Sequence, residues 1–217
     1  MIYLGNNHVG YHQSDLCFPA IAGCHAICYV TAKGLFGFHN MGGAEEKLTI
    51  KNNAGKVVRR LNIWKPRSET FASFVTSHPQ GNAIGKMLYG VCFATGGNSR
   101  GYGNKAPLSV WLGELTSFAK ALNYTGPIWG YDMANQTRPQ PVNVRYGKVG
   151  SSCVIQLKSY HPVETLKGPN SAPNDHQLIR KDNATDPPTF KLQATESRVV
   201  TSISDTGWQT IYPEKLN

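Results

Sequence analysis

Two residues in the stretch AGCHAICYVTAKGLFGFHN, positions 22–40, could carry nucleophilic chemistry. Cys24 follows a glycine and opens an apolar run, and His39 closes the next apolar run fifteen positions later. A thiol becomes an effective nucleophile when a neighbouring imidazole accepts its proton and a third group orients that imidazole. Gly23 would let the backbone approach a substrate closely or supply N–H groups to an oxyanion. The pattern therefore predicts a cysteine–histidine site.

Two other interpretations fit the same residues. Free cysteine is among the most buried residue types, so two core residues would leave the same pattern. Zinc binding by Cys24, Cys28 and His39 is disfavoured, because four residues of extended strand separate the two cysteines by about 13 Å. The paired Cys-x2-Cys spacing of a zinc site is also absent. We therefore expect neither a metal nor another cofactor.

Cys28 is a rival nucleophile. Two apolar segments separated by Ala-Lys-Gly at 32–34 predict a β-hairpin. If the last two of these residues formed a tight turn, Cys28 would face His39 across the hairpin. Cys24 would then reach the histidine only if its strand bent, bulged or began after it. The hairpin geometry leaves the two thiols level.

The segments AGCHAIC and GLFGFH resemble the catalytic segment of the cytotoxic necrotizing factor and dermonecrotic toxin group. In that group a cysteine in a Ser-Gly-Cys context precedes the catalytic histidine by the same fifteen positions, and here Ala22 replaces the serine. The resemblance covers about residues 18–43. The chemotaxis receptor deamidases and a single-domain bacterial lethal factor that deamidates a translation factor share this fold and this cysteine–histidine logic. The length of the present chain is most similar to that compact type.

The resemblance implies a protein-glutamine deamidase, with Cys24 rather than Cys28 as the nucleophile and His39 as the general base and acid. Some relatives transfer amines instead, so a transglutaminase is the alternative within enzymes. A third group steadies the histidine in these relatives, sometimes a threonine six positions before the cysteine. That position is Phe18 here, which leaves either its backbone carbonyl or a polar side chain from elsewhere, for which the candidates are Asp132, Asn6 and Asn7.

The resemblance also implies a bacterial toxin or effector, whose partner is a target protein carrying the glutamine, such as a small GTPase or a translation factor. The start MIYLGNNHVGYHQSDL lacks the basic region and apolar core of a signal peptide, and no apolar stretch is long enough for a membrane span. We expect a monomer in the bacterial cytoplasm before delivery, secreted without a classical signal peptide or delivered into the target cell cytosol.

The charge distribution supports a competing function. The net charge is +9, and the basic residues from Lys47 to Arg67 follow one another without an intervening acid: Lys47, Lys51, Lys56, Arg59, Arg60, Lys65 and Arg67. Such a basic segment attracts an acidic partner. A catalytically silent immunity or adaptor module could dock through it. The four tryptophans are spread along the chain, which is not the pattern of a nucleic-acid stacking platform.

The length of 217 residues predicts a single catalytic domain over 1–217, and an odd set of five cysteines favours reduced thiols. The elements expected to position the site are hairpins at 24–40 and 47–64, helices at 68–78 (capped by Ser68) and 108–124, and strands at 86–95, 126–133, 151–160 and 190–212. A long Pro-rich surface loop is expected at about 160–190. Together they predict a mixed α/β fold, a mostly antiparallel β-sandwich core flanked by helices and deamidase-like by the resemblance, with the site at one edge of the sandwich.

Overall fold

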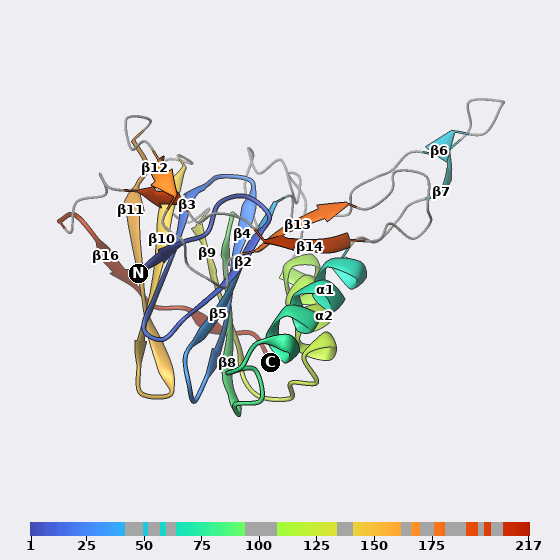
Figure 1. The fold of residues 1–217 in the computed structure, drawn as a ribbon, viewed down its shortest axis with the longest axis horizontal. Coiled ribbons are helices and arrows are strands. Elements are labelled where there is room, and N and C mark those ends of the chain that lie inside the picture. The colour runs from blue at the N-terminus through green and yellow to red at the C-terminus, as the bar shows by residue number, and fades with distance from the viewer. Residues whose placement is uncertain are drawn as a thin grey trace.

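The computed structural model describes residues 1–41, 50–51, 57–59, 64–93, 108–133, 141–161, 166–169, 176–180, 190–194, 198–200 and 206–217. The described residues form a strand-rich, mixed α/β fold with two main sheets, mostly antiparallel, and two helices (Figure 1). The prediction of a mixed, mostly antiparallel fold is confirmed at this level.

The larger sheet has eight strands, with β5 and β4 in its middle. Every neighbouring pair in it is antiparallel except β8 and β9, which are parallel. In spatial order the strands are β14 (Phe190–Ala194), β13 (His176–Arg180), β2 (His8–His12), β5 (Leu35–Met41), β4 (Cys24–Thr31), β8 (Gly85–Cys92), β9 (Ile128–Asp132) and β17 (Glu214–Lys215).

The second main sheet has five strands, and two short strand pairs accompany the main sheets. In spatial order the five are β1 (Ile2–Tyr3), β3 (Asp15–Ile21), β10 (Val142–Val149), β11 (Ser152–Ser159) and β16 (Gln209–Ile211). The pairs are β6 (Ile50–Lys51) with β7 (Val57–Arg59), and β12 (Leu166–Pro169) with β15 (Arg198–Val200).

Two helices, α1 (Trp64–Ser77) and α2 (Leu108–Ala121), lie together on the face of the larger sheet that is turned away from the five-stranded sheet (Figure 1). Neither is long and apolar enough to cross a membrane. The larger sheet is therefore covered on both faces, by a sheet on one side and by helices on the other. All eight residues of β4 are buried as a result. This is why the run CHAICYVT shows no alternation of apolar and polar residues.

Two apolar clusters fill the two interfaces of the larger sheet. The cluster between the sheets contains Cys24, Ala26 and Cys28 of β4 together with Phe18 and Tyr146 from the five-stranded sheet. The cluster under the helices contains Ile27 and Tyr29 of β4, and Phe71 of α1 and Phe118 of α2. Because successive strand residues point to opposite faces, β4 contributes alternate residues to each cluster.

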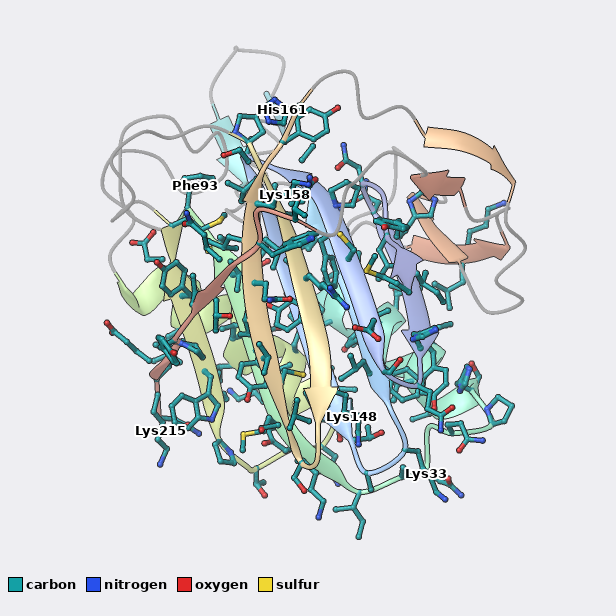
Figure 2. All side chains as sticks on the ribbon, turned by 90° about the vertical axis from the view of Figure 1, so that its left-hand side faces the viewer. Lys33, Phe93, Lys148, Lys158, His161 and Lys215 are labelled. Atoms are coloured by element: carbon teal, nitrogen blue, oxygen red, sulfur yellow. The ribbon has the colours of Figure 1, made fainter. Side chains whose placement is uncertain are left out.

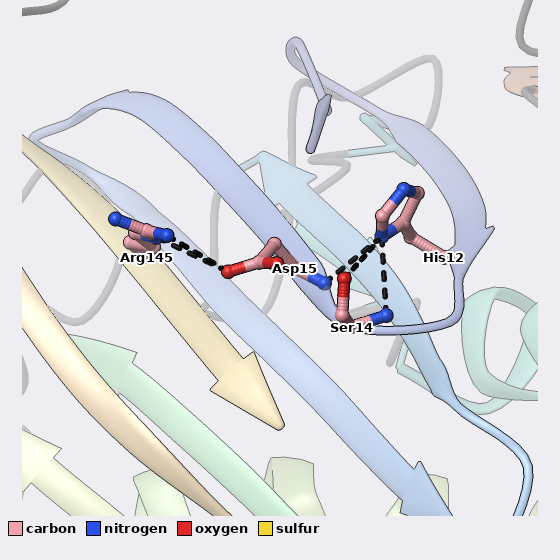
Figure 3. A network of polar contacts seen from close by, with 4 residues as sticks. All are labelled: His12, Ser14, Asp15 and Arg145. Carbon is pink, nitrogen blue, oxygen red and sulfur yellow. Dashed lines mark hydrogen bonds and ion pairs between the residues drawn. The ribbon is translucent and has the colours of Figure 1, made fainter. Parts of the chain in front are cut away.

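A polar network joins the turn after β2 to the five-stranded sheet (Figure 3). His12 Nδ1 accepts hydrogen bonds from the backbone N–H groups of Ser14 (3.2 Å) and Asp15 (2.9 Å). The Asp15 carboxylate in turn pairs with Arg145 of β10 at 2.9 Å. Burial lowers the pKa of His12, which keeps the ring neutral and Nδ1 able to accept. His12 therefore stabilises the turn between β2 and β3.

Two expectations about elements are wrong. The helix expected to begin with Ser68 as its cap begins at Trp64, so Ser68 lies inside α1 and its hydroxyl donates to the Lys65 carbonyl at 2.9 Å. The segment 160–190, expected to be an irregular surface connection, contains strands β12 and β13, while residues 162–165, 170–175 and 181–189 of it lie outside the described residues. Pairing of β13 with β2 makes it part of the larger sheet, which proline content and low apolar content did not indicate.

Substitution of Gly37 on β5 tests how tightly the two main sheets pack against each other. A Cβ at Gly37 would lie 2.6 Å from a Leu4 methyl group and 2.8 Å from the Phe18 ring. We expect Gly37→Ala to lower the free energy of unfolding by about 1–3 kcal/mol through overpacking, measured by urea denaturation. Gly147→Ala on β10 is the control, because its Cβ would make only an ordinary 3.5 Å contact with Asp15. Equal losses in the two variants would contradict this packing argument.

Candidate active site

The hairpin of β4 and β5 places His39 directly opposite Ala26, with Cys24 opposite Met41 and Cys28 opposite Gly37. The expected turn centred on Lys33 and Gly34, which would have put Cys28 opposite His39, is wrong. The last cross-strand pair is Val30 with Leu35, and the Thr31 N–H donates to the Gly34 carbonyl at 2.8 Å, so the turn spans 31–34 with Ala32 and Lys33 at its centre. The Thr31 hydroxyl donates to the Gly34 carbonyl at 3.0 Å and accepts the Gly34 N–H at 3.1 Å, which stabilises the turn at this position.

The register alone does not choose between the two thiols. Cys24 and Cys28 each lie one diagonal step from His39 on the same face of the sheet, a separation of roughly 7–8 Å that an imidazole side chain can span. Their surroundings differ. Cys28 is fully buried, and burial together with the nearby Cys153 thiol raises the pKa of Cys28 well above its ordinary value. Cys24 is 8% exposed, at the first position of β4. These surroundings favour Cys24 as the nucleophile.

Residues 4–7, between β1 and β2, contact both members of the pair. The Leu4 carbonyl accepts a hydrogen bond from His39 Nδ1 at 2.7 Å, and the Asn7 N–H donates to the His39 carbonyl at 2.8 Å. The Cys24 thiol donates to Asn6 Oδ1 at 3.8 Å. Asn7 adopts a φ of 61°, in the left-handed region that asparagine tolerates better than most residues. This turn lays the backbone of residues 4–7 beside the hairpin.

The hydrogen bond to Leu4 determines the protonation pattern of His39. A backbone carbonyl only accepts, so Nδ1 must carry the hydrogen and Nε2 carries the lone pair of the neutral ring. His39 Nε2 is buried and has no hydrogen-bond partner among the described residues. Burial lowers the pKa of His39 to about 4, outweighing the opposite effect of the Leu4 hydrogen bond. Near neutral pH the ring is therefore uncharged, with its lone pair on the buried Nε2.

A small residue opposite His39 and two aromatic rings form the surroundings of the imidazole. Ala26, directly opposite His39, is fully buried and has only a methyl group on that face. The Phe18 ring lies 6.2 Å from the His39 ring, between centroids, and the Tyr146 ring packs edge-on against Phe18 at 5.5 Å. The Tyr146 hydroxyl donates to the Ala26 carbonyl at 2.9 Å, which ties β4 to the opposite sheet. The surroundings of His39 are therefore apolar and well packed.

The group bound to His39 Nδ1 in the structure is the Leu4 carbonyl, which was not among the candidates named from the sequence. Phe18 contributes its ring and not its carbonyl, because Leu4 occupies Nδ1. Asp132 lies on β9, three strands from His39 across the sheet, or roughly 14 Å. Gly23 lies in the bend immediately before β4, beside Cys24. Leu4 was missed because a backbone carbonyl leaves no trace in residue type.

The site lies at the end of the larger sheet where β4 begins. Strands β4 and β5 are central in the larger sheet. Cys24 lies toward the same end as Phe93, which follows β8. Figure 2 shows Phe93, Lys158 and His161 at this end of the molecule, and Lys33 and Lys148 at the opposite end. A reacting group would therefore have to approach along the strand direction.

The basic segment 47–67 is only partly described. Lys47, Lys56 and Arg60 lie outside the described residues, and only the strand positions of Lys51 and Arg59 are described. The Lys65 side chain is 80% exposed and lies 3.8 Å from Glu69. Arg67 is only 5% exposed, and its guanidinium donates to Asn40 Oδ1 at 2.5 Å. Arg67 is therefore a buried residue and does not belong to a docking surface.

Comparison with known proteins gives no family for this chain. No protein-family model matches it, and no curated protein sequence matches it significantly. Among the residues that the structure describes, no group of three or more histidine, cysteine, aspartate or glutamate side chains could hold a metal ion.

Burial of neutral His39 should make stability depend on pH. The pKa of histidine is about 6.5 in an unfolded chain and about 4 for folded His39, so between about pH 4 and pH 6.5 the unfolded state binds more of the proton than the folded state does. The stabilising contribution is complete above about pH 6.5 and is lost as the pH falls toward 4. Lowering the pH from about 7.5 to 5 should remove about 2 kcal/mol of it, measured by urea unfolding. The His39→Gln variant, whose side chain does not titrate, should lack this part of the pH dependence. If the free energy of unfolding depended on pH identically in both proteins, the pH dependence could not be assigned to His39.

Proposed function

We propose that this protein is a cysteine hydrolase that deamidates glutamine side chains of a target protein, with Cys24 as nucleophile and His39 as general base and acid. The observation that carries the proposal is the state of His39. Its Nδ1 is tied to the Leu4 carbonyl, while its buried Nε2 makes no hydrogen bond among the described residues. A buried polar atom without a partner is unfavourable and calls for an explanation, which a catalytic role would supply. One diagonal step away lies the thiol of Cys24.

The proposed reaction begins when the Cys24 sulfur attacks the carbon of the glutamine carboxamide. His39 Nε2 takes the thiol proton as the carbon–sulfur bond forms, because its pKa of about 4 leaves the resting ring uncharged. The same proton then passes to the departing nitrogen, so ammonia leaves and a thioester remains. Water attacks the thioester with His39 as base, which releases glutamate and restores the thiol.

Asn6 would assist at the sulfur end of the site. Its carboxamide lies 3.8 Å from the Cys24 sulfur and offers N–H groups as well as the oxygen. In the proposed reaction these N–H groups, together with the backbone beside Gly23, would stabilise the oxyanion that develops on the substrate.

The resemblance of residues 18–43 to the necrotizing factor group supports glutamine as the substrate, and with it a deamidase-like β-sandwich. A backbone carbonyl as the third group agrees with this resemblance, since a backbone group orients the histidine in the necrotizing factors. We further propose a bacterial toxin or effector that acts on a protein in the target cell, such as a small GTPase or a translation factor.

Separate replacement of Cys24 and of Cys28 by serine tests which cysteine is the nucleophile. Cys24→Ser should fold normally and lose turnover by several orders of magnitude, as losses of catalytic triad members do elsewhere. Cys28→Ser should cost stability at most, because its thiol is fully buried in the core. His39→Ala should abolish turnover and slow alkylation of Cys24 near pH 7. Turnover is measured as ammonia released from a protein glutamine.

Each variant must keep the native circular dichroism spectrum. If Cys28→Ser loses ammonia release while Cys24→Ser retains it, the nucleophile has been assigned wrongly. If neither serine substitution matters, a catalytically silent binding module becomes the better description of this protein.

The target can be sought by mass spectrometry of a cell lysate treated with the protein. We expect one or a few glutamines to become glutamates with wild-type protein and none with Cys24→Ser. Adding a primary amine distinguishes the two enzyme reactions, because a transglutaminase would attach the amine to the same glutamine. Identical glutamine profiles for wild-type protein and Cys24→Ser would count against both reactions.

A further inference from the structure

Four polar side chains form a buried cluster on the other face of the same strand pair. His25 of β4, Asn40 of β5 and Glu114 of α2 are fully buried, and Arg67 of α1 is 5% exposed. Glu114 Oε2 lies 2.9 Å from His25 Nδ1, and Glu114 Oε1 accepts a hydrogen bond from the Asn40 side-chain amide. Asn40 Oδ1 accepts a hydrogen bond from Arg67 at 2.5 Å. One carboxylate of α2 therefore bridges both strands, and Asn40 connects this network to Arg67 of α1.

The cluster lies directly behind the candidate catalytic pair. His25 follows Cys24 in the chain and Asn40 follows His39, and His25 and Asn40 are cross-strand partners. Because successive strand residues point to opposite faces, each catalytic candidate shares a peptide unit with a residue held by Glu114. A displacement of His25 or Asn40 would therefore move Cys24 or His39.

The surroundings make room for this arrangement. Gly90 of β8 lies beneath the His25 ring, and a Cβ at Gly90 would be only 2.2 Å from His25 Nε2. The rest of this interface is apolar, formed by residues such as Phe38, Phe71 and Phe118. A polar cluster inside an apolar layer imposes directional contacts where apolar packing would tolerate small shifts.

Net stabilisation of the fold is a weak explanation for the presence of this buried cluster. Arg67 carries a permanent positive charge, and the amide of Asn40 links it to the Glu114 carboxylate. Buried charged groups contribute little net stability compared with apolar residues of similar volume, because both charges lose their hydration. Their hydrogen bonds do, however, specify a particular geometry.

We propose that Glu114 is a positioning residue, which fixes His25 relative to Asn40 and thereby the diagonal between Cys24 and His39. This inference rests on the proposed Cys24–His39 chemistry. It assigns the functional importance of α2 to a side chain that touches neither the thiol nor the substrate.

The test measures how much His39 accelerates the reaction of Cys24 with iodoacetamide at pH 7. The His39 factor is the alkylation rate constant of Cys24, resolved by peptide mass spectrometry, divided by the constant measured in the His39→Ala background. Glu114→Asp keeps the charge but withdraws the carboxylate by about 1.5 Å, so its His39 factor should fall at least about tenfold, since misplacement by 1 Å can cost about a hundredfold. Glu114→Gln keeps the reach to both partners and should retain most of the factor.

A second variant and a control make the test independent of folding. Arg67→Lys keeps the positive charge and changes the contact with Asn40, so it should lower the factor even if Glu114→Asp does not fold. Val75→Ala removes buried volume from the same helix, roughly 12 Å along the axis from Arg67. It should lower the melting temperature and leave the factor unchanged.

The outcomes separate this inference from the proposed function. A wild-type factor near one would overturn the proposed function. A large wild-type factor that persists in every folded variant at Glu114 and Arg67 would overturn the positioning role alone. An equal loss in Val75→Ala would also overturn it, because general destabilisation would then explain the effect. A loss in Glu114→Asp, or in Arg67→Lys where Glu114→Asp does not fold, with Val75→Ala unchanged, supports it.

Discussion

The hydrogen bond from His39 Nδ1 to the Leu4 carbonyl is the interaction on which the candidate site depends. It assigns the ring proton to Nδ1, and so leaves the basic nitrogen on the other side of the ring. It also holds residues 4–7 against β5, and with them Asn6, whose carboxamide contacts the Cys24 thiol. Without this bond the imidazole could rotate or change tautomer, and the short N-terminal strand β1 would lose a link to the larger sheet. The orientation of the His39 ring and the position of Asn6 thus depend on one hydrogen bond.

The second constraint is that the central strands are covered on both faces. One face of β4 and β5 carries the thiol and the imidazole in an apolar layer, and the other carries the cluster of His25, Asn40, Glu114 and Arg67. Strand alternation forces these two sets into one backbone. A chemical requirement on one face therefore limits what the other face can contain, and both become sensitive to the register of the hairpin.

Apolar runs and periodicity along the chain predicted those elements that depend mainly on residues close together in the sequence. The hairpin of β4 and β5 and the mixed, mostly antiparallel class are confirmed, and so is the helix expected at 108–124, which the structure has as Leu108–Ala121, since apolar runs and helical periodicity carry them. The position of the turn at 31–34 was missed because the Thr31 hydroxyl stabilises it, which residue type alone does not reveal. Leu4 acts through its backbone, and His25 draws its importance from Glu114, 89 positions away. Both depend on tertiary contacts, which a pattern along the chain does not contain.

The four-residue turn at 31–34 changes the meaning of the fifteen-position interval that first drew attention to Cys24 and His39. Opposed residues of an antiparallel pair always share a face, whatever the length of the connection between them. Lengthening the turn would therefore alter the interval and leave the diagonal between thiol and imidazole intact. A one-residue insertion within β4 after Cys24 would instead move the thiol to the helix face, beside the charged cluster. The interval is thus a by-product of turn length, and proteins with the same arrangement at another spacing would escape a search that requires fifteen.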